Sequence, residues 1–290
     1  MREILMKNKF MTTRMYVIVF ALFTAFSANA VVHRALIFGL GKQKDNRWGK
    51  IHGDNDVYHV EQMLRTIGFT DVTSLKNEKS TKQAIVKAFV DLASRCKNGD
   101  IVYIHYSGHG QLMTDLDGDE AGRWSGGHAD WDEAWIPYDA YMSYCKEDRG
   151  EKHLSDDEVA DLLTKIRQRV GKKGQITVVV DACHSGDATR GDDDEFVRGV
   201  DLKFCIPKTN TNVQKSSHVQ EQWRTISACK PYQLCMEMKE LQIGKLTYAL
   251  CSLGQQSFKM SNAKLEETLN TFMDMNKGRL PQNPMVSGTK

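Results

Sequence analysis

Two short segments combine reactive side chains with glycine. Cys183 lies in Asp181-Ala-Cys-His-Ser-Gly186, and His109 lies between two glycines in Tyr106-Ser-Gly-His-Gly110. A thiol and an imidazole brought together supply a nucleophile and a general base or acid. Backbone N–H groups of a glycine-containing turn can stabilise the oxyanion that forms when a thiolate attacks a carbonyl. The pair predicts nucleophilic hydrolysis; the alternative is an inert buried thiol and a structural histidine.

Strand and helix patterns alternate along the chain and place both segments at strand ends. Apolar runs at 100–106 and 174–180 predict two buried strands, which lead directly into His109 and Cys183. The alternation predicts an α/β fold with a mainly parallel central sheet and helices on both faces. Ligand sites in such sheets lie beyond the carboxyl ends of the strands. Further strands are expected at 32–40, 72–75 and 223–228, and helices at 54–68, 81–96, 156–169, 246–253 and 265–275.

Local signals refine this pattern at two places. Ser155, with Glu158 three residues later, predicts a capping box at the start of the 156–169 helix. Between residues 186 and 222 the periodicity fades, and the sequence is polar and rich in turn-forming residues. We therefore expect a long exposed linker there and an extended tail over 280–290.

The two reactive segments together resemble the paired signatures of metacaspases and related caspase-like cysteine peptidases. The resemblance implies a caspase-like three-layer α/β sandwich that hydrolyses peptide bonds, with His109 and Cys183 as the catalytic dyad. It divides residues 31–290 into a large-subunit-like part (31–189), a linker (190–222) and a small-subunit-like part (223–290). Weaker similarities are found at 35–39, 51–56, 130–139, 226–229, 244–250 and 281–284.

The resemblance also implies cleavage after Arg or Lys. Asp56 and Asp181 match the pocket acids of the family, and Ser107 matches a pocket hydroxyl. Carboxylates form strong charge-assisted hydrogen bonds with a basic side chain. Two departures stand out: the segment before Asp56 is one residue shorter than the family's, and Lys230-Pro231 follows Cys229 where the family often has an acid and Gln. Capping of its own turn is the alternative role of Asp181.

No cofactor is needed for thiol chemistry, but the resemblance implies Ca²⁺ as an activator. The acids that match the family's calcium positions are Asp132, Asp156 and Asp157. A further family acid falls near Arg190, where Asp187 or Asp192 could substitute. The segment 115–120 is acidic but lacks the ligand spacing of an EF-hand, which favours a solvated loop.

Activation by self-cleavage is a further expectation. A peptidase specific for basic residues can cut its own linker, although any surface loop contains basic residues. The candidates in the expected linker are Arg190, Arg198, Lys203, Lys208 and Lys215.

The first 30 residues predict export. A basic region is followed by an apolar run at 15–26 and by the small residues of Ser27-Ala-Asn-Ala30, as in a secretory signal. The run is too short for a membrane span, which needs about 20 residues. We expect a periplasmic or secreted protein without a membrane contact once the signal is cleaved; an uncleaved anchor is the alternative.

Charge and cysteine content bound the remaining possibilities. The chain carries 39 basic and 37 acidic side chains, and the small excess lies in the signal, so nucleic acid is not an expected partner. Seven cysteines leave at least one without an intramolecular disulfide, and Cys183 is the candidate. We expect a monomer that acts on proteins or peptides. The rivals are a clostripain- or gingipain-like peptidase and a catalytically silent caspase-like binding module, against which the intact dyad argues.

Overall fold

A six-stranded sheet forms the centre of the fold. The computed structural model describes residues 30–118, 131–184, 196–207, 222–278 and 280–289, and contacts divide the chain after Val31, so the fold below is that of Val32–Lys290. The strand order is β11-β8-β7-β3-β1-β2, and all neighbours are parallel except β11 against β8. The strands are β1 (His33–Gly39), β2 (Asp71–Lys76), β3 (Ile101–Ser107), β7 (Gln175–Asp181), β8 (Arg224–Ser227) and β11 (Met285–Gly288).

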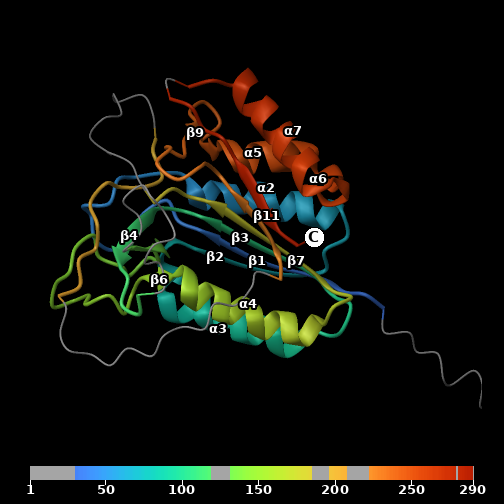
Figure 1. Ribbon diagram of the computed structural model, residues 1–290, viewed down its shortest axis with the longest axis horizontal. Coiled ribbons are helices and arrows are strands. Elements are labelled where there is room, and N and C mark those ends of the chain that lie inside the picture. Colours follow the sequence, from blue (N-terminus) through green and yellow to red (C-terminus); the bar gives the residue numbers. More distant parts are fainter. Residues whose placement is uncertain (1–29, 119–130, 185–195, 208–221, 279, 290) are drawn as a thin grey trace, which may run out of the picture. The chain divides into compact units, whose positions relative to one another are not determined.

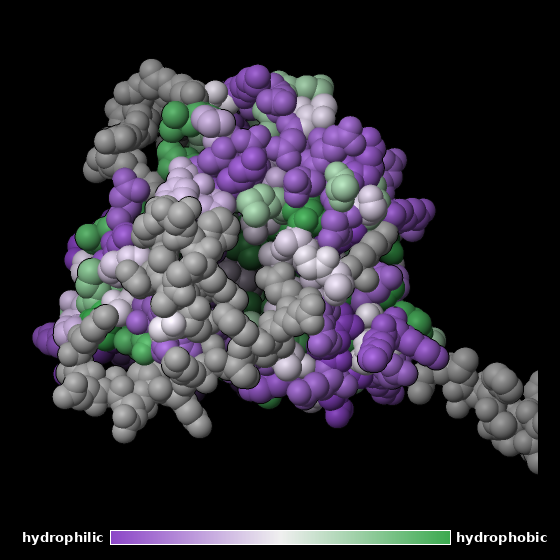
Figure 2. Space-filling model, viewed as in Figure 1, coloured by the Kyte–Doolittle hydropathy of each residue, from purple (hydrophilic) through white to green (hydrophobic). Residues whose placement is uncertain are grey.

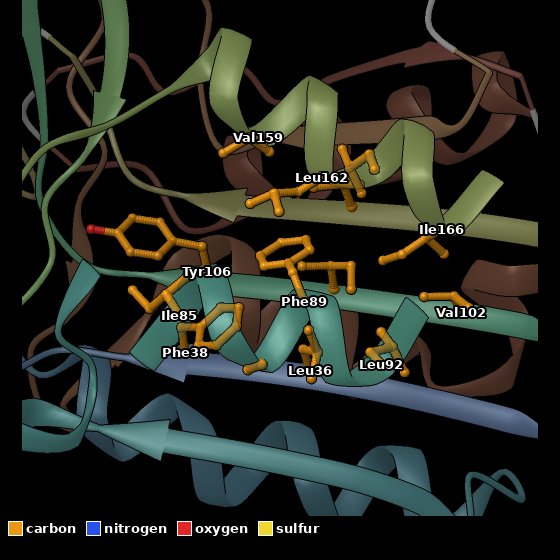
Figure 3. Packing of buried hydrophobic residues seen from close by; sticks show 14 of the residues in the cluster. Leu36, Phe38, Ile85, Phe89, Leu92, Val102, Tyr106, Val159, Leu162 and Ile166 are labelled. Atoms are coloured by element: carbon orange, nitrogen blue, oxygen red, sulfur yellow. The ribbon is translucent and has the colours of Figure 1, made fainter. Parts of the chain in front are cut away.

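Helices α3 (Lys82–Arg95) and α4 (Asp156–Val170) cover one face of this sheet, as Figure 1 shows. Their apolar side chains pack on alternate residues of β1, β3 and β7, and the parallel strands are therefore buried on both sides. Figure 3 shows this packing around Phe89 of α3 and Leu162 of α4. The capping box that the sequence predicts at Ser155 and Glu158 is present at the start of α4.

Three other helices cover the opposite face (Figure 1). They are α2 (Gly53–Thr66), α5 (Lys245–Leu253) and α7 (Asn262–Met275), with the short α6 (Gln255–Lys259) between the last two. Their apolar residues pack on Ala35, Ile37 and Val179 of the sheet. The three-layer caspase-like sandwich that the resemblance implies is confirmed, with every predicted strand and helix found within a few residues of its expected bounds.

Smaller sheets flank the carboxyl ends of the central strands. One consists of β4 (Gly110–Thr114), β5 (Trp131–Trp135) and β6 (Leu154–Ser155), and the other of β9 (Glu237–Met238) and β10 (Ile243–Gly244). Short segments with one or two apolar residues give weak periodicity, and the sequence therefore did not reveal β4, β9 or β10. A 3-10 turn, η1 (Asn77–Lys79), follows β2.

The expectation of a long exposed linker was wrong for residues 197–200 and for Phe204, whereas Asp201, Leu202 and Cys205 are exposed as expected. Val197, Arg198, Val200 and Phe204 are buried in this segment, and Arg198 and Phe204 are fully so. The segment bridges Met236 on one side and β4 on the other, and these pairings bury it despite the polar sequence around it. The rest of the expected linker, except residue 222, lies outside the described residues, as do residues 1–29 of the expected signal.

The face of the molecule drawn in Figure 2 is mostly polar. Figure 2 shows hydrophilic side chains over most of the described residues on that face, with apolar ones in small separate patches. No helix among the described residues is long and apolar enough to cross a membrane. None of the seven cysteines, all of which are described, forms a disulfide.

Candidate active site

His109 and Cys183 follow neighbouring strands at the same edge of the sheet. β3 and β7 are parallel and in register, with Ser107 opposite Asp181, and each reactive residue stands two positions beyond its strand's last residue. The Tyr106 hydroxyl donates to the His109 carbonyl at 2.6 Å and accepts from the Ile136 N–H at 2.9 Å. The Tyr106 ring also stacks on Trp135, and these contacts fix the turn that carries His109.

The surroundings of His109 fix its tautomer. Its Nε2 lies 2.7 Å from the Gly49 carbonyl, which can only accept, and Nε2 therefore carries the proton. The buried Nδ1 has no hydrogen-bond partner among the described residues, so its lone pair is available. Burial lowers the pKa of His109 to about 4, although the Gly49 carbonyl opposes the shift, and the ring is neutral at pH 7. Trp48 packs on the ring with centroids 5.1 Å apart.

Cys183 supplies one of two N–H groups that converge on a single carbonyl. The N–H of Cys183 donates to the Arg198 carbonyl at 2.9 Å, and the N–H of Gly110 donates to the same oxygen at 3.3 Å. Two backbone donors on one carbonyl oxygen are the arrangement that stabilises an oxyanion in acyl transfer. Cys183 is only 2% exposed. Gly199 lies against it, since a Cβ on Gly199 would be 2.6 Å from the Cys183 Sγ.

The three residues assigned to the basic pocket lie together. Ser107 donates to the Asp56 carboxylate, and the Arg198 guanidinium donates to Asp56 at 2.7 Å and lies 3.5 Å from Asp181. Further hydrogen bonds hold both acids in place. The Gly244 N–H donates to Asp56, and the Thr247 N–H and hydroxyl both donate to Asp181. Asp181 therefore does more than cap its turn.

The two pocket acids differ in pKa. Burial raises the pKa of Asp56 to about 6, even though Arg198 pulls it down. Burial would also raise the pKa of Asp181, but Arg198, Cys235 and Thr247 outweigh it and lower the pKa. A buried pocket with both carboxylates charged is costly without a cation, because desolvation opposes each charge.

Glu237 is a third acid of this pocket that the sequence did not reveal. Its carboxylate lies 2.9 Å from an Arg198 terminal nitrogen and accepts from Arg198 Nε at 3.0 Å. The other oxygen lies 2.6 Å from His52 Nδ1, and the His52 N–H also donates to Glu237. Burial alone would lower the pKa of Arg198, but the three acids raise it well above its usual value. No spacing in the sequence connects Glu237 with Asp56, because β9 is joined to α2 only through the fold.

The three acids assigned to calcium lie in or next to the small sheet formed by β4, β5 and β6. Asp132 is in β5, and Asp156 and Asp157 begin α4 directly after β6, the partner strand of β5. Among the described residues, no three His, Cys, Asp or Glu side chains are grouped so that they could hold a metal ion. The substitutes Asp187 and Asp192 lie outside the described residues.

Three further residues near the dyad take structural contacts. His105 is fully buried, as its strand position predicts, and shares a hydrogen bond with the Thr247 hydroxyl at 3.1 Å. His184, next to the thiol, lies 3.2 Å from Glu133 of β5. The Cys229 thiol donates to the Gln233 carbonyl at 3.3 Å, which tightens the turn that holds Lys230-Pro231.

Comparison with known proteins defines the family. The model of the caspase domain matches residues 32–289, so the chain belongs to the caspase-domain family of cysteine peptidases. Among curated proteins it is 30% identical to metacaspase-1B of Neurospora crassa over 166 residues, which are 54% of this chain and 34% of that protein. It is 36% identical to metacaspase-1 of Eremothecium gossypii over 109 residues, which are 37% of this chain and 20% of that protein. The chain thus spans about a third or less of these relatives' lengths.

Solved structures support the fold. A Geobacter sulfurreducens protein superposes with a TM-score of 0.63 at 23% identity, over 89% of this chain and 94% of that one. Caspase-1 from Spodoptera frugiperda superposes with a TM-score of 0.53 at 12% identity, over 89% of this chain and 86% of that one. At these identities the likeness establishes the caspase-like fold.

Proposed function

We propose that the chain is a cysteine endopeptidase that cuts after Arg or Lys, with Cys183 as nucleophile and His109 as general base and acid. One observation carries the proposal: an arginine side chain sits among three carboxylates while its own carbonyl accepts from the N–H groups of Cys183 and Gly110. A substrate residue before the cut bond needs both features, a complementary pocket and an oxyanion site.

Under this proposal, hydrolysis of the peptide bond proceeds in two stages, through a thioester on Cys183. The Cys183 thiol passes its proton to Nδ1 of His109, and Sγ attacks the carbonyl carbon to give an oxyanion on the two N–H groups. His109 returns the proton to the leaving amine as the C–N bond breaks, and a thioester remains. His109 then takes a proton from water, the hydroxide attacks the thioester, and the thiol and a carboxylic acid are released.

The direct test compares peptides that differ only in the residue before the reporter. The Phe-Val-Arg and Phe-Val-Lys aminocoumarins should be cut, and the Phe-Val-Asp aminocoumarin should be left intact. Cys183→Ala should cut none. Cleavage of the Asp peptide would refute the basic specificity, and no cleavage by a fully folded wild type, with or without calcium, would favour the silent binding module.

Calcium stimulation is proposed on the family resemblance alone. Because Asp132, Asp156 and Asp157 do not form a three-acid group as placed, an ion held by them would need further oxygen ligands. Titration of CaCl₂ against EGTA in the peptide assay tests this, with Asp157→Asn as the variant expected to shift the half-maximal concentration. Turnover that does not change with calcium would refute the proposal.

Export and a monomeric state are likewise proposed from the sequence. The expected signal at 1–30 should be absent from the mature protein, whose N-terminus should be Val31. N-terminal sequencing after expression with the native leader tests the cut, and light scattering tests the mass. A retained leader in a membrane fraction would favour the uncleaved anchor.

A further inference from the structure

The two N–H groups that meet the Arg198 carbonyl come from different sheets. The Cys183 N–H follows β7 of the central sheet, whereas the Gly110 N–H begins β4 of the small sheet. They donate to the carbonyl oxygen at 2.9 Å and 3.3 Å, respectively. Under the proposed function an oxyanion takes the place of this oxygen, and both donors must keep their spacing to within about 0.5 Å. That spacing depends on the contacts between the two segments.

One contact joins the two segments on the amino side of the donors. The Gly108 N–H donates to the Asp181 carbonyl at 3.3 Å. These two residues stand two positions before Gly110 and Cys183 in the sequence. Beyond this hydrogen bond the chain leaves the central sheet for β4, and a separate contact holds the carboxyl side.

Glu133 and His184 form the contact on the carboxyl side. The Glu133 carboxylate lies 3.2 Å from Nδ1 of His184. Glu133 belongs to β5 and is the register partner of Leu112 in β4. His184 directly follows Cys183 in the sequence. An ionised carboxylate only accepts, so Nδ1 of His184 carries a proton. The contact therefore joins the sheet that carries one donor to the turn that carries the other.

The His184 ring also packs against Gly110 itself. A Cβ on Gly110 would lie 2.7 Å from Cδ2 of this ring and 2.5 Å from the Cys183 carbonyl oxygen. Gly110 is therefore enclosed by the ring and by the backbone of the nucleophile. Nε2 of His184 is buried and has no hydrogen-bond partner among the described residues, so the orientation of the ring depends on Glu133 at Nδ1.

We propose that Glu133 and His184 are positioning residues for the oxyanion site. Glu133 orients the His184 ring, and the ring supports Gly110, so that the N–H groups of Gly110 and Cys183 point at one oxygen. The inference rests on the proposed function, and His109 remains the base. Loss of either positioning residue should slow the chemical step and leave the binding of a basic side chain unchanged, because other residues form the acid pocket.

Steady-state kinetics on the Phe-Val-Arg peptide test this division. Glu133→Ala and His184→Ala should each lower kcat by about 10- to 100-fold and leave KM within twofold, since a misplacement of about 1 Å can cost 10²-fold. His184→Asn keeps an N–H donor near the position of Nδ1 and should recover most of the lost kcat. A loss that falls on KM rather than kcat would overturn the proposal.

The matched control for Glu133→Ala is Asp91→Ala. Asp91 pairs with Lys87 on α3, and its side chain is 48% exposed, against 44% for Glu133. This control should leave kcat within twofold, and circular dichroism should show the same secondary structure in every variant. An equal loss of kcat in the control would overturn the proposal.

A double variant tests whether the two residues act as one unit. Because Glu133 acts through the ring, Glu133→Ala combined with His184→Ala should lose no more kcat than His184→Ala alone. Losses that multiply would overturn the pairing. Each variant is assayed in CaCl₂ and in EGTA, because Glu133 adjoins Asp132. Recovery of kcat in excess calcium would assign Glu133 to ion binding and overturn the proposal.

Two reagents locate the effect at the oxyanion. The S–H group of Cys183 adds across the C=O bond of a Phe-Val-Arg aldehyde, and the resulting oxygen lies in the two-donor site. Its inhibition constant should therefore rise by about the factor by which kcat falls. Iodoacetamide alkylates the thiolate without an oxyanion, and its rate of inactivation should stay within twofold. Unchanged aldehyde affinity in both variants would overturn this inference alone, whereas a folded wild type that cuts no peptide would overturn the proposed function.

Discussion

Two arginine clusters lie at opposite ends of the same parallel strands. At the amino ends, Arg34 of β1 lies 2.5 Å from Asp71 and 2.8 Å from Asp100. At the carboxyl ends, Arg198 meets Asp56, Asp181 and Glu237. The ion-pair chemistry is the same, but Arg34 belongs to a strand of the sheet, whereas Arg198 belongs to a segment outside it.

The pKa values of the acids differ between the two clusters. Burial opposes ionisation in both clusters. At the amino end Arg95 and Arg34 outweigh it at Asp71, and Arg34 with two backbone N–H groups outweighs it at Asp100, so the pKa values of both acids are lowered. At the carboxyl end the pKa of Asp56 is raised to about 6. One cluster has as much positive charge and as many donors as its acids need, and the other has an excess of buried acid. Under the proposed function, this excess of acid would be balanced by the basic side chain of a bound substrate.

The largest expected effect is the loss of the nucleophile beside the second cluster. Cys183→Ala should lower kcat for Phe-Val-Arg peptides by about 10⁶-fold, as removal of a catalytic nucleophile does elsewhere. The Arg198 contacts should persist, so the melting temperature should stay close to that of uncut wild type. Progress curves of peptide hydrolysis measure kcat, and calorimetry measures the melting temperature. A variant that keeps more than about 10⁻³ of the wild-type activity would show that Cys183 is not the nucleophile.

The next effect separates the two clusters by function. Asp181→Asn should lower kcat/KM for Arg peptides by about 10² to 10³-fold, because it removes one partner of a buried charge pair. Asp100→Asn, the matched change in the Arg34 cluster, should leave kcat/KM of the cut enzyme within twofold. Equal losses in both variants would mean that the carboxyl-end cluster is only structural.

A change in the Arg34 cluster should lower the stability of the protein rather than its activity. Arg34→Met leaves the buried Asp100 without its cation, whereas Asp71 keeps its ion pair with Arg95, and the change should lower the free energy of unfolding by about 3 kcal/mol. Urea denaturation of the Cys183→Ala background, which cannot cut itself, measures the loss without interference from cleavage. A change below about 0.5 kcal/mol would show that the Arg34 pairs contribute little.

The smallest effect is a pH dependence confined to the pocket. A carboxyl is neutral below its pKa, so Asp56 loses its charge as pH falls through about 6, and KM for Arg peptides should rise by up to about tenfold between pH 7 and 5. Asp71 and Asp100 have lowered pKa values, and their stabilisation is kept above their unfolded pKa of about 3.9 and lost below it.

The control for this profile is Asp56→Asn. Its KM should be higher than that of wild type at pH 7 and nearly flat between pH 5 and 8. A wild-type KM that stays constant over the same range would show that Asp56 is already neutral or does not contact the substrate.

Local signals explain what the sequence could predict. Strong apolar runs gave β3 and β7, and the parallel topology then required His109 and Cys183 to share an edge. The capping box at Ser155 was equally local. Asp56 and Ser107 were found only through the family resemblance, since they come from different elements of the first half of the chain.

Long-range pairing explains what the sequence could not predict. Arg198 was one basic residue among five in a polar stretch, and only its pairing with Met236 and β4 buries it. Glu237 sits in a two-residue strand with no periodicity, and Gly49 acts through its carbonyl, which any residue has. In each case the role comes from a partner far away in the sequence.

The strand pairing at Cys235–Glu237 limits the kinds of protein that this enzyme could digest. In a helix the backbone N–H and carbonyl groups are hydrogen-bonded within the helix. An arginine in a folded helix therefore cannot form the backbone hydrogen bonds that Phe196 and Arg198 form here. Under the proposed function, a target has to present at least three residues in an extended conformation, as in interdomain connections, chain ends and damaged or unfolded proteins. Selection would then depend as much on the target's loss of structure as on its side chains.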